Sequence, residues 1–160
     1  MSDSIPPIQE PVTGHEHIAD PAQPQFALAQ FYRALGARDL ALMERNWDDS
    51  PEAVMDNPLG GIRRGWAEIR QTYEALFNAA WAYSFEFWDY TLHRSGEVFW
   101  AVGRERGRLS KEGETLDLAI RTTRLFRWRD GCWRQVHHHG SIEDPEMLAR
   151  YVAAVRRGRQ

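Results

Sequence analysis

The chain has 160 residues, a formal net charge of −3 and one cysteine. This length is enough for one domain with its own core, and a lone cysteine excludes an intramolecular disulfide. Binding to nucleic acid or to an anionic membrane is not expected, because both require clustered positive charge. We also find no apolar run of the ~20 residues that cross a bilayer and no secretion signal, and we therefore expect a cytoplasmic protein.

The first 24 residues contain five prolines and few apolar side chains. Such a composition buries too little surface to offset the entropy lost on ordering. The sequence therefore predicts a flexible tail over residues 1–24 and a single domain over residues 25–160.

Residues 25–78 predict three helices, with a short strand between the second and the third. In the first helix, apolar residues recur at the i, i+3, i+4, i+7 spacing that forms one helical face, and Gly36 ends it. The second helix runs from about Asp39 to Ser50, and the strand covers Ala53–Asp56. The apolar stripes are Leu28, Phe31, Tyr32 and Leu35 in the first helix and Trp66, Ile69, Tyr73 and Phe77 in the third, which follows Gly65.

The rest of the chain predicts four long strands and a last helix. The strands are rich in aromatic and β-branched residues and are separated by short hairpin-type links, so that consecutive strands should pair antiparallel. They are Trp81–His93, Glu97–Ser110, Thr115–Arg129 and Cys132–Ser141. The last helix begins with Asp144 as its cap and Pro145 in its first turn.

Helices followed by an antiparallel run of strands indicate an α+β domain in which a bent sheet wraps around the helices. Such a wrap leaves a recess where a small ligand can bind. Tryptophans that lie on the outer face of the sheet would form an apolar patch, and we therefore expect a symmetric homodimer through that face. Several of five tryptophans could form this patch, and the others would belong to the core: Trp81, Trp88, Trp100, Trp128 and Trp133.

The most informative segment is residues 123–141, which read TRLFRWRDGCWRQVHHHGS. It resembles the closing hairpin of the SnoaL-like and calcium/calmodulin-dependent protein kinase II association-domain branches of the nuclear transport factor 2-like superfamily. Those branches carry a Thr-Arg-aliphatic-aromatic strand, an Arg-Asp-Gly turn, a Trp and a Val-His-x-His-x-Ser run, in this order. The resemblance implies a cone-shaped, curved antiparallel sheet around the N-terminal helices.

The resemblance also implies which arginines line the cavity. Arg124 lies in the Thr-Arg strand, and Arg104 occupies the matching place in the strand before it. A third arginine of the association domains falls at Gly140 here, so an anion site would be weaker or differently shaped. An alternative is that Arg104 belongs to a solvated stripe on the outer face.

His137 and His139 are two residues apart on a strand and therefore share a face. On the pocket wall they could act as acid–base groups, as hydrogen-bond partners or as metal ligands, or they could be purely structural. No third metal ligand is fixed by spacing, and we predict no metal and no cofactor. Pairing around the Asp130–Gly131 turn would set Arg124 opposite His137 and Thr122 opposite His139, whereas a bulge would bring Arg121 inward.

The turn after the first strand is similar to the part of ketosteroid isomerase that holds the catalytic aspartate before a proline. Here that position is Asn57, and an amide cannot act as a general base. The base is therefore missing unless Asp56 turns inward. Asp56, Asn57 and Tyr73 are added to the candidate ligand-binding residues.

A buried arginine requires a carboxylate or a ligand anion. Arg124 therefore pairs either with an internal group such as Glu105 or Asp56, or with an acidic substrate. The predicted function is binding of a small ligand that carries a carboxylate. Two alternatives stay open, a SnoaL-like, dehydratase-like or isomerase-like enzyme that uses His137 or His139, and an oligomeric assembly module.

Overall fold

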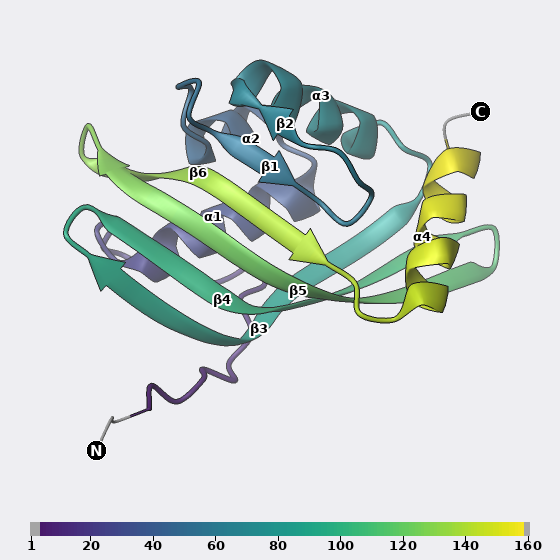
Figure 1. Ribbon diagram of the computed structural model, residues 1–160, viewed down its shortest axis with the longest axis horizontal. Helices are drawn as coiled ribbons and strands as arrows, with labels where there is room; N and C mark the ends of the chain where they lie inside the picture. Colours follow the sequence, from purple (N-terminus) through teal and green to yellow (C-terminus); the bar gives the residue numbers. More distant parts are fainter. Residues whose placement is uncertain (1–3, 159–160) are drawn as a thin grey trace.

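The computed structural model describes residues 4–158 and arranges them in four helices and six strands (Figure 1). None of the helices in this range is long and apolar enough to cross a membrane. In chain order the elements are α1 (Pro24–Ala37), α2 (Leu40–Asn46), β1 (Val54–Asp56), β2 (Arg63–Arg64), α3 (Gly65–Phe77), β3 (Ala82–Ser95), β4 (Val98–Lys111), β5 (Glu114–Arg129), β6 (Cys132–Ser141) and α4 (Pro145–Arg157).

The six strands form one curved, open sheet in the order β2-β1-β6-β5-β4-β3. The neighbours from β3 to β6 pair antiparallel, and β1 runs parallel to β6. Helices α1, α2 and α3 cover the concave face, and α4 lies across one end of the sheet (Figure 1). This arrangement confirms the predicted α+β class and the sheet that wraps around N-terminal helices.

Local sequence accounts for most of these elements. The predicted stripe of α1 is buried throughout, from Leu28 to Leu35. Along β5 buried residues alternate with more exposed ones from Leu116 to Phe126, as expected for a strand with one face on the core. Asp130 and Gly131 both have positive φ, which is the backbone that a two-residue hairpin turn requires.

The second helix ends earlier than predicted. It stops at Asn46, because the next two residues pair with the edge of β6 instead. Trp47 forms an isolated parallel bridge with Gln135, and the amide of Asp48 donates to the Gln135 carbonyl at 2.9 Å. The short strand β2, which pairs with β1, is not predicted by the sequence.

A bulge changes the register of the closing hairpin. Leu125 pairs with His137, but the next residue, Phe126, pairs with Gln135, so Val136 is an extra residue in β6. Arg124 therefore lies opposite His138, not opposite His137 as predicted. Because the extra residue is in β6, the bulge reverses the faces of the histidines and leaves Arg124 pointing to the core.

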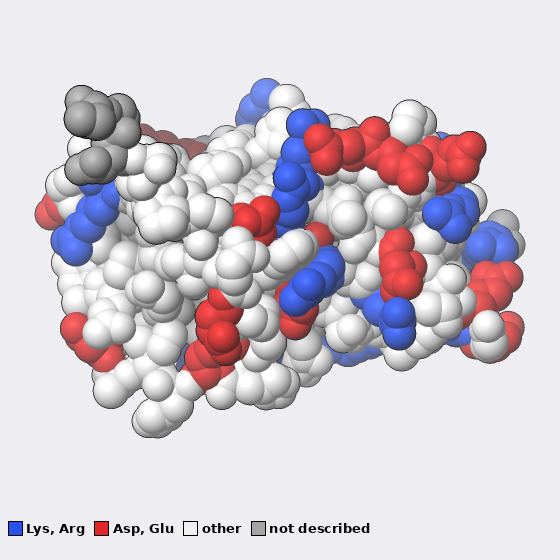
Figure 2. Space-filling view, turned by 90° about the horizontal axis from the view of Figure 1, so that it is seen from below, with Lys and Arg blue, Asp and Glu red and all other residues white. Residues whose placement is uncertain are grey.

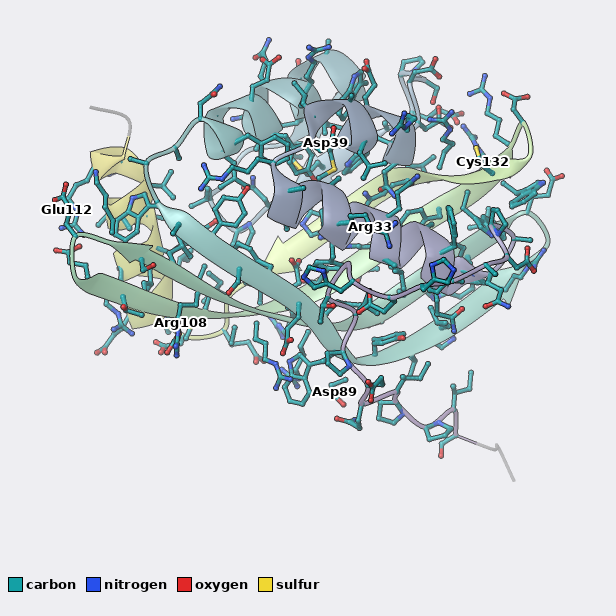
Figure 3. All side chains as sticks on the ribbon, turned by 180° about the vertical axis from the view of Figure 1, so that it is seen from behind. Arg33, Asp39, Asp89, Arg108, Glu112 and Cys132 are labelled. Atoms are coloured by element: carbon teal, nitrogen blue, oxygen red, sulfur yellow. The ribbon has the colours of Figure 1, made fainter. Side chains whose placement is uncertain are left out.

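The predicted flexible tail needs correction for its described part, whereas Met1–Asp3 lie outside the described residues. Ile8 and Val12 form bridges with Tyr90 and Phe87 on the outer edge of β3, and Val12 is buried. Figure 3 shows this segment running along the sheet edge and past Arg33 of α1. The free edge of β3 supplies backbone partners, so the segment needs little apolar surface of its own.

Candidate functional site

A cavity of about 150 Å³ lies between the concave face of the sheet and the helices. Its walls come from α1, α3 and α4, from residues of β1, β3, β4, β5 and β6, and from the loop that follows β1. Most of the lining is apolar or aromatic and includes Phe31, Tyr73, Leu76, Trp81, Leu109 and Tyr151. Concave, mainly apolar sites with few polar groups are typical of small-molecule binding sites.

Arg124 is the main polar feature of this wall, and it is 1% exposed. Its guanidinium donates to Glu105 Oε1 at 3.2 Å, to Gln135 Oε1 at 2.8 Å and to the Tyr32 hydroxyl at 3.3 Å. The guanidinium carbon also lies 3.6 Å from the centre of the Phe31 ring, within the range of a cation–π contact. The arginine is therefore held at the cavity wall by Tyr32, Gln135, Glu105 and Phe31.

The charge of Arg124 is balanced inside the protein. Burial lowers the pKa of the guanidinium, but the attraction to Tyr32 and Glu105 outweighs this effect, and the pKa lies above its usual value. Glu105 is also buried, and its Oε1 accepts a second hydrogen bond from Thr122 at 3.0 Å. Of the partners expected for a buried arginine, the structure contains the internal carboxylate of Glu105. Arg124 therefore has a counter-charge without a ligand carboxylate.

His138 is the histidine that lines the cavity. It is buried, and burial, followed by the nearby charge of Arg124, holds the pKa of its imidazole well below the usual 6.5. The ring is therefore neutral near pH 7. Among the described residues, its Nδ1 atom is buried and has no hydrogen-bond partner.

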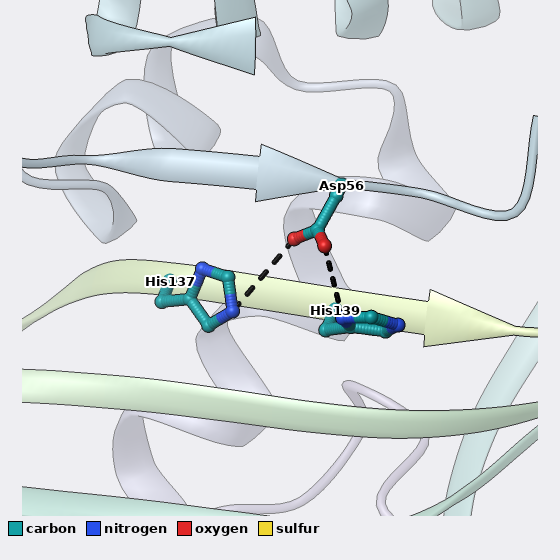
Figure 4. Close-up of side chains that lie close together, drawn as sticks. All are labelled: Asp56, His137 and His139. Atoms are coloured by element: carbon teal, nitrogen blue, oxygen red, sulfur yellow. Dashed lines mark ion pairs between the residues drawn. The ribbon is translucent and has the colours of Figure 1, made fainter. Parts of the chain in front are cut away.

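His137 and His139 lie on the opposite face of β6, so the prediction that they line the cavity is wrong. His139 Nδ1 is 2.9 Å from one carboxylate oxygen of Asp56, and His137 Nε2 is 3.7 Å from the other (Figure 4). The side chain of His137 is 35% exposed and that of His139 is 55% exposed. Asp56 has therefore turned outward, and the carboxylate that an isomerase-type site would need is not in the cavity.

Arg104 and Arg121 also lie on the outer face of the sheet, and neither lines the cavity. Arg104 pairs with Asp89 at 3.2 Å, and both arginines reach Glu143, at 3.7 Å from Arg104 and 3.2 Å from Arg121. Figure 2, which views the molecule from below, shows basic and acidic side chains side by side on this surface. Arg104 therefore belongs to a solvated stripe on the outer face, which is the alternative that the sequence analysis left open.

Two further candidates do line the cavity. Tyr73 of α3 is buried, and burial raises the pKa of its hydroxyl to about 12. Asn57 lies at the cavity wall, where its Oδ1 accepts a hydrogen bond from the Leu59 amide at 3.0 Å. The cavity thus combines Arg124, Tyr73 and Asn57, which the sequence singles out, with His138, which sequence reasoning places on the wrong face.

These features define a class of protein: an α+β domain with a mainly apolar cavity between its curved sheet and its helices. A family model described as the SnoaL-like domain matches residues 25–145. The chain belongs to this family, and its fold is that of the nuclear transport factor 2-like proteins. The expected family is thereby confirmed.

One curated relative is the F-box protein SKIP8 of Arabidopsis thaliana, which is 26% identical over 113 residues. The match covers 71% of this chain and 46% of the relative, so the chain spans about half the length of that protein.

Solved structures share the fold at low sequence identity. A protein proposed to be a dehydratase of the NTF2-like family from Streptomyces avermitilis is 18% identical, with a TM-score of 0.69 over 76% of this chain and 94% of its own. A proposed calcium/calmodulin-dependent protein kinase type II association domain from Thiobacillus denitrificans is 24% identical, with a TM-score of 0.64 over 80% of this chain and 100% of its own.

Proposed function

We propose that the domain binds one small, mainly apolar and uncharged molecule in the cavity beside Arg124. The observation that carries this proposal is that the polar groups of the wall are neutral as a set. The Arg124–Glu105 pair cancels its own charge, and His138 is neutral. A charged ligand would therefore have to lose its hydration without gaining a counter-charge, which is costly.

The polar groups favour a ligand with one hydroxyl or carbonyl group. The hydrogen bonds that Glu105 accepts from Thr122 and Arg124 both reach Oε1, so Oε2 is the atom of this carboxylate that a ligand hydroxyl would reach. His138 Nδ1 supplies a second polar atom without a partner in the described chain. Buried polar groups are normally satisfied, and a ligand that reached either atom would be held by it.

Phenol is a suitable probe, because a cavity of about 150 Å³ accepts a molecule the size of benzene. Benzoate has the same ring and carries a carboxylate in place of the hydroxyl. We expect phenol to bind with one-to-one stoichiometry in calorimetric titration and benzoate to bind at least about tenfold more weakly.

Two tryptophan variants test where the probe binds. Leu76→Trp places a large ring at the cavity wall and should abolish the phenol signal, whereas Val102→Trp places the same ring on the outer face, where Val102 is 43% exposed, and should not. Tighter binding of benzoate than of phenol, or phenol binding that survives Leu76→Trp, would contradict the proposal.

Proton-transfer catalysis is the second candidate, because a carboxylate and a neutral imidazole line the same cavity. In this mechanism Glu105 and His138 are the acid–base groups, the role that the sequence analysis expects of His137 or His139. Exchange of deuterium from D₂O into cyclohexanone, followed by NMR, separates this candidate from simple binding. Enzymatic exchange should be lost in Glu105→Gln, and exchange that persists in this variant would exclude Glu105 as the base.

We also retain the homodimer as a proposal. Trp88 and Trp100 lie on the outer face of the sheet beside Val102, which is one of the more exposed large apolar residues of the described chain. In light scattering coupled to size exclusion, Val102→Asp should shift a wild-type dimer to a monomer. A monomeric wild-type protein would contradict the proposal.

A further inference from the structure

A cluster of metal-ligating side chains lies on the opposite face of β6 from the cavity. Parallel pairing places Asp56 of β1 beside His139 of β6, and His137 lies two residues earlier on the same face. One ligand atom from each residue lies within 4.8 Å of the other two. Figure 4 shows the two imidazoles on either side of the Asp56 carboxylate.

The hydrogen bond of His137 to the backbone leaves this cluster, within the described chain, without a positive charge or donor between its acceptor atoms. Its Nδ1 is 3.0 Å from the carbonyl oxygen of Val54, and because a carbonyl can only accept, the proton is on Nδ1. In a neutral ring the lone pair of Nε2 then faces the Asp56 carboxylate at 3.7 Å. Asp56 Oδ1 is itself buried, with no hydrogen-bond donor among the described residues. Two acceptors face each other here and require a cation between them.

We propose that Asp56, His137 and His139 bind one divalent first-row transition-metal ion, such as Zn²⁺ or Co²⁺. Two imidazoles and one carboxylate are ligand types that such ions prefer, and three protein ligands leave further positions open to water. The bond from His137 Nδ1 to the Val54 carbonyl is the outer contact that commonly fixes a metal-binding histidine. The cluster thus supplies three metal ligands and a hydrogen bond that orients one of them.

Side-chain movements would bring the three ligand atoms, which lie within 4.8 Å of one another, to the spacing of a metal site. With bonds of about 2.0–2.1 Å, neighbouring ligand atoms lie about 3–3.4 Å apart. The Asp56–His139 distance of 2.9 Å would lengthen slightly, and the Asp56–His137 distance of 3.7 Å would shorten. His139 Nδ1 lies 2.9 Å from a carboxylate oxygen, which can only accept, so the ion would bind the other neutral tautomer, in which the proton has moved from Nδ1 to Nε2.

The neighbouring charges permit a cation at this position. Arg121 lies on the same face of β5, but its guanidinium is paired with Glu143 at 3.2 Å and donates to the Ser141 hydroxyl at 3.2 Å. Arg64 pairs across from Val54 on β2 and is exposed to solvent, where its charge is screened.

The test is titration of the untagged full-length chain with Co²⁺ in a buffer that does not bind metals, followed by visible absorption and calorimetry. We expect one saturable site with the absorption of coordinated Co²⁺. Asp56→Asn and His139→Gln should each weaken binding by at least about tenfold. Circular dichroism verifies that both variants remain folded.

Two controls locate the ion. His93→Gln removes another strand histidine, which is stacked on Trp100 outside the cluster, and should leave Co²⁺ binding unchanged. His15→Gln/His17→Gln removes the histidines of the N-terminal segment and should also have no effect. Absence of saturable binding would mean that a proton is the cation between His137 and Asp56, and the proposal would fall. Binding that survives Asp56→Asn, or is lost with His15 and His17, would overturn it as well.

Discussion

At the residue scale, the partner of Arg124 decides what the cavity can hold. A buried guanidinium without a counter-charge would attract an anionic ligand, but Glu105 lies 3.2 Å away and is buried with it. The two residues project from β5 and β4 to the same side of the sheet. Alternation along the strands therefore brings the pair together, and the pair makes the cavity neutral.

Removing one partner tests how closely the two charges depend on each other. Glu105→Gln leaves Arg124 charged and buried without a carboxylate, and we expect the free energy of unfolding to fall by about 3–5 kcal/mol in denaturant titration. The double variant Glu105→Leu/Arg124→Met should recover most of this loss, because it removes both charges.

Asp117→Asn is the matched control, because it breaks the solvent-exposed pair with Arg108. It should leave the unfolding midpoint unchanged. Equal stability of Glu105→Gln and the wild type would show that Arg124 does not depend on Glu105.

The sequence predicts the inward face of Arg124 correctly but not the inward face of His138. The first follows from the resemblance of the Thr-Arg segment to the association domains, with Arg121 as the alternative, whereas the second depends on the extra residue Val136 in β6. A bulge is a tertiary feature, and nothing in the local pattern of β6 marks it. The same bulge puts His137 and His139 beside Asp56, so the cluster could not be predicted either.

At the element scale, five of the six strands are predicted to within a few residues, and only the two-residue strand β2 is not. Strands β3 to β6 carry long aromatic and β-branched runs with clear turns between them. Strands β1 and β2 cover three and two residues, and their pairing depends on contacts far away in the chain. The parallel pairing of β1 with β6 is such a contact, and it positions Asp56.

The N-terminal segment offers a test at this scale. The amides of Phe87 and Tyr90 donate to the carbonyls of Val12 and Ile8 at 2.9 Å and 3.1 Å. In a chain that lacks residues 1–12, these two amides should exchange with solvent much faster in hydrogen-exchange NMR. Amides that pair β4 with β5 should keep their protection. Unchanged exchange at Phe87 and Tyr90 would show that the segment does not protect the edge of β3.

At the scale of the whole molecule, the order of elements is enough to predict the architecture. Three helices and a short strand followed by four antiparallel strands leave few ways to bury all the apolar stripes, and the curved sheet around the helices is the one observed. Function is less predictable, because the charge balance of the cavity depends on which residues of β4, β5 and β6 meet.

The most direct measurement of the central claim is ¹⁵N NMR of the histidine rings with and without phenol, at about pH 6, below the usual histidine pKa of about 6.5. His138, identified from the spectrum of His138→Gln, should remain neutral because burial holds its pKa well below 6.5. Its ring signals should also shift when phenol is added, while those of His137 and His139 do not. A protonated His138, or phenol shifts confined to His137 and His139, would contradict the account.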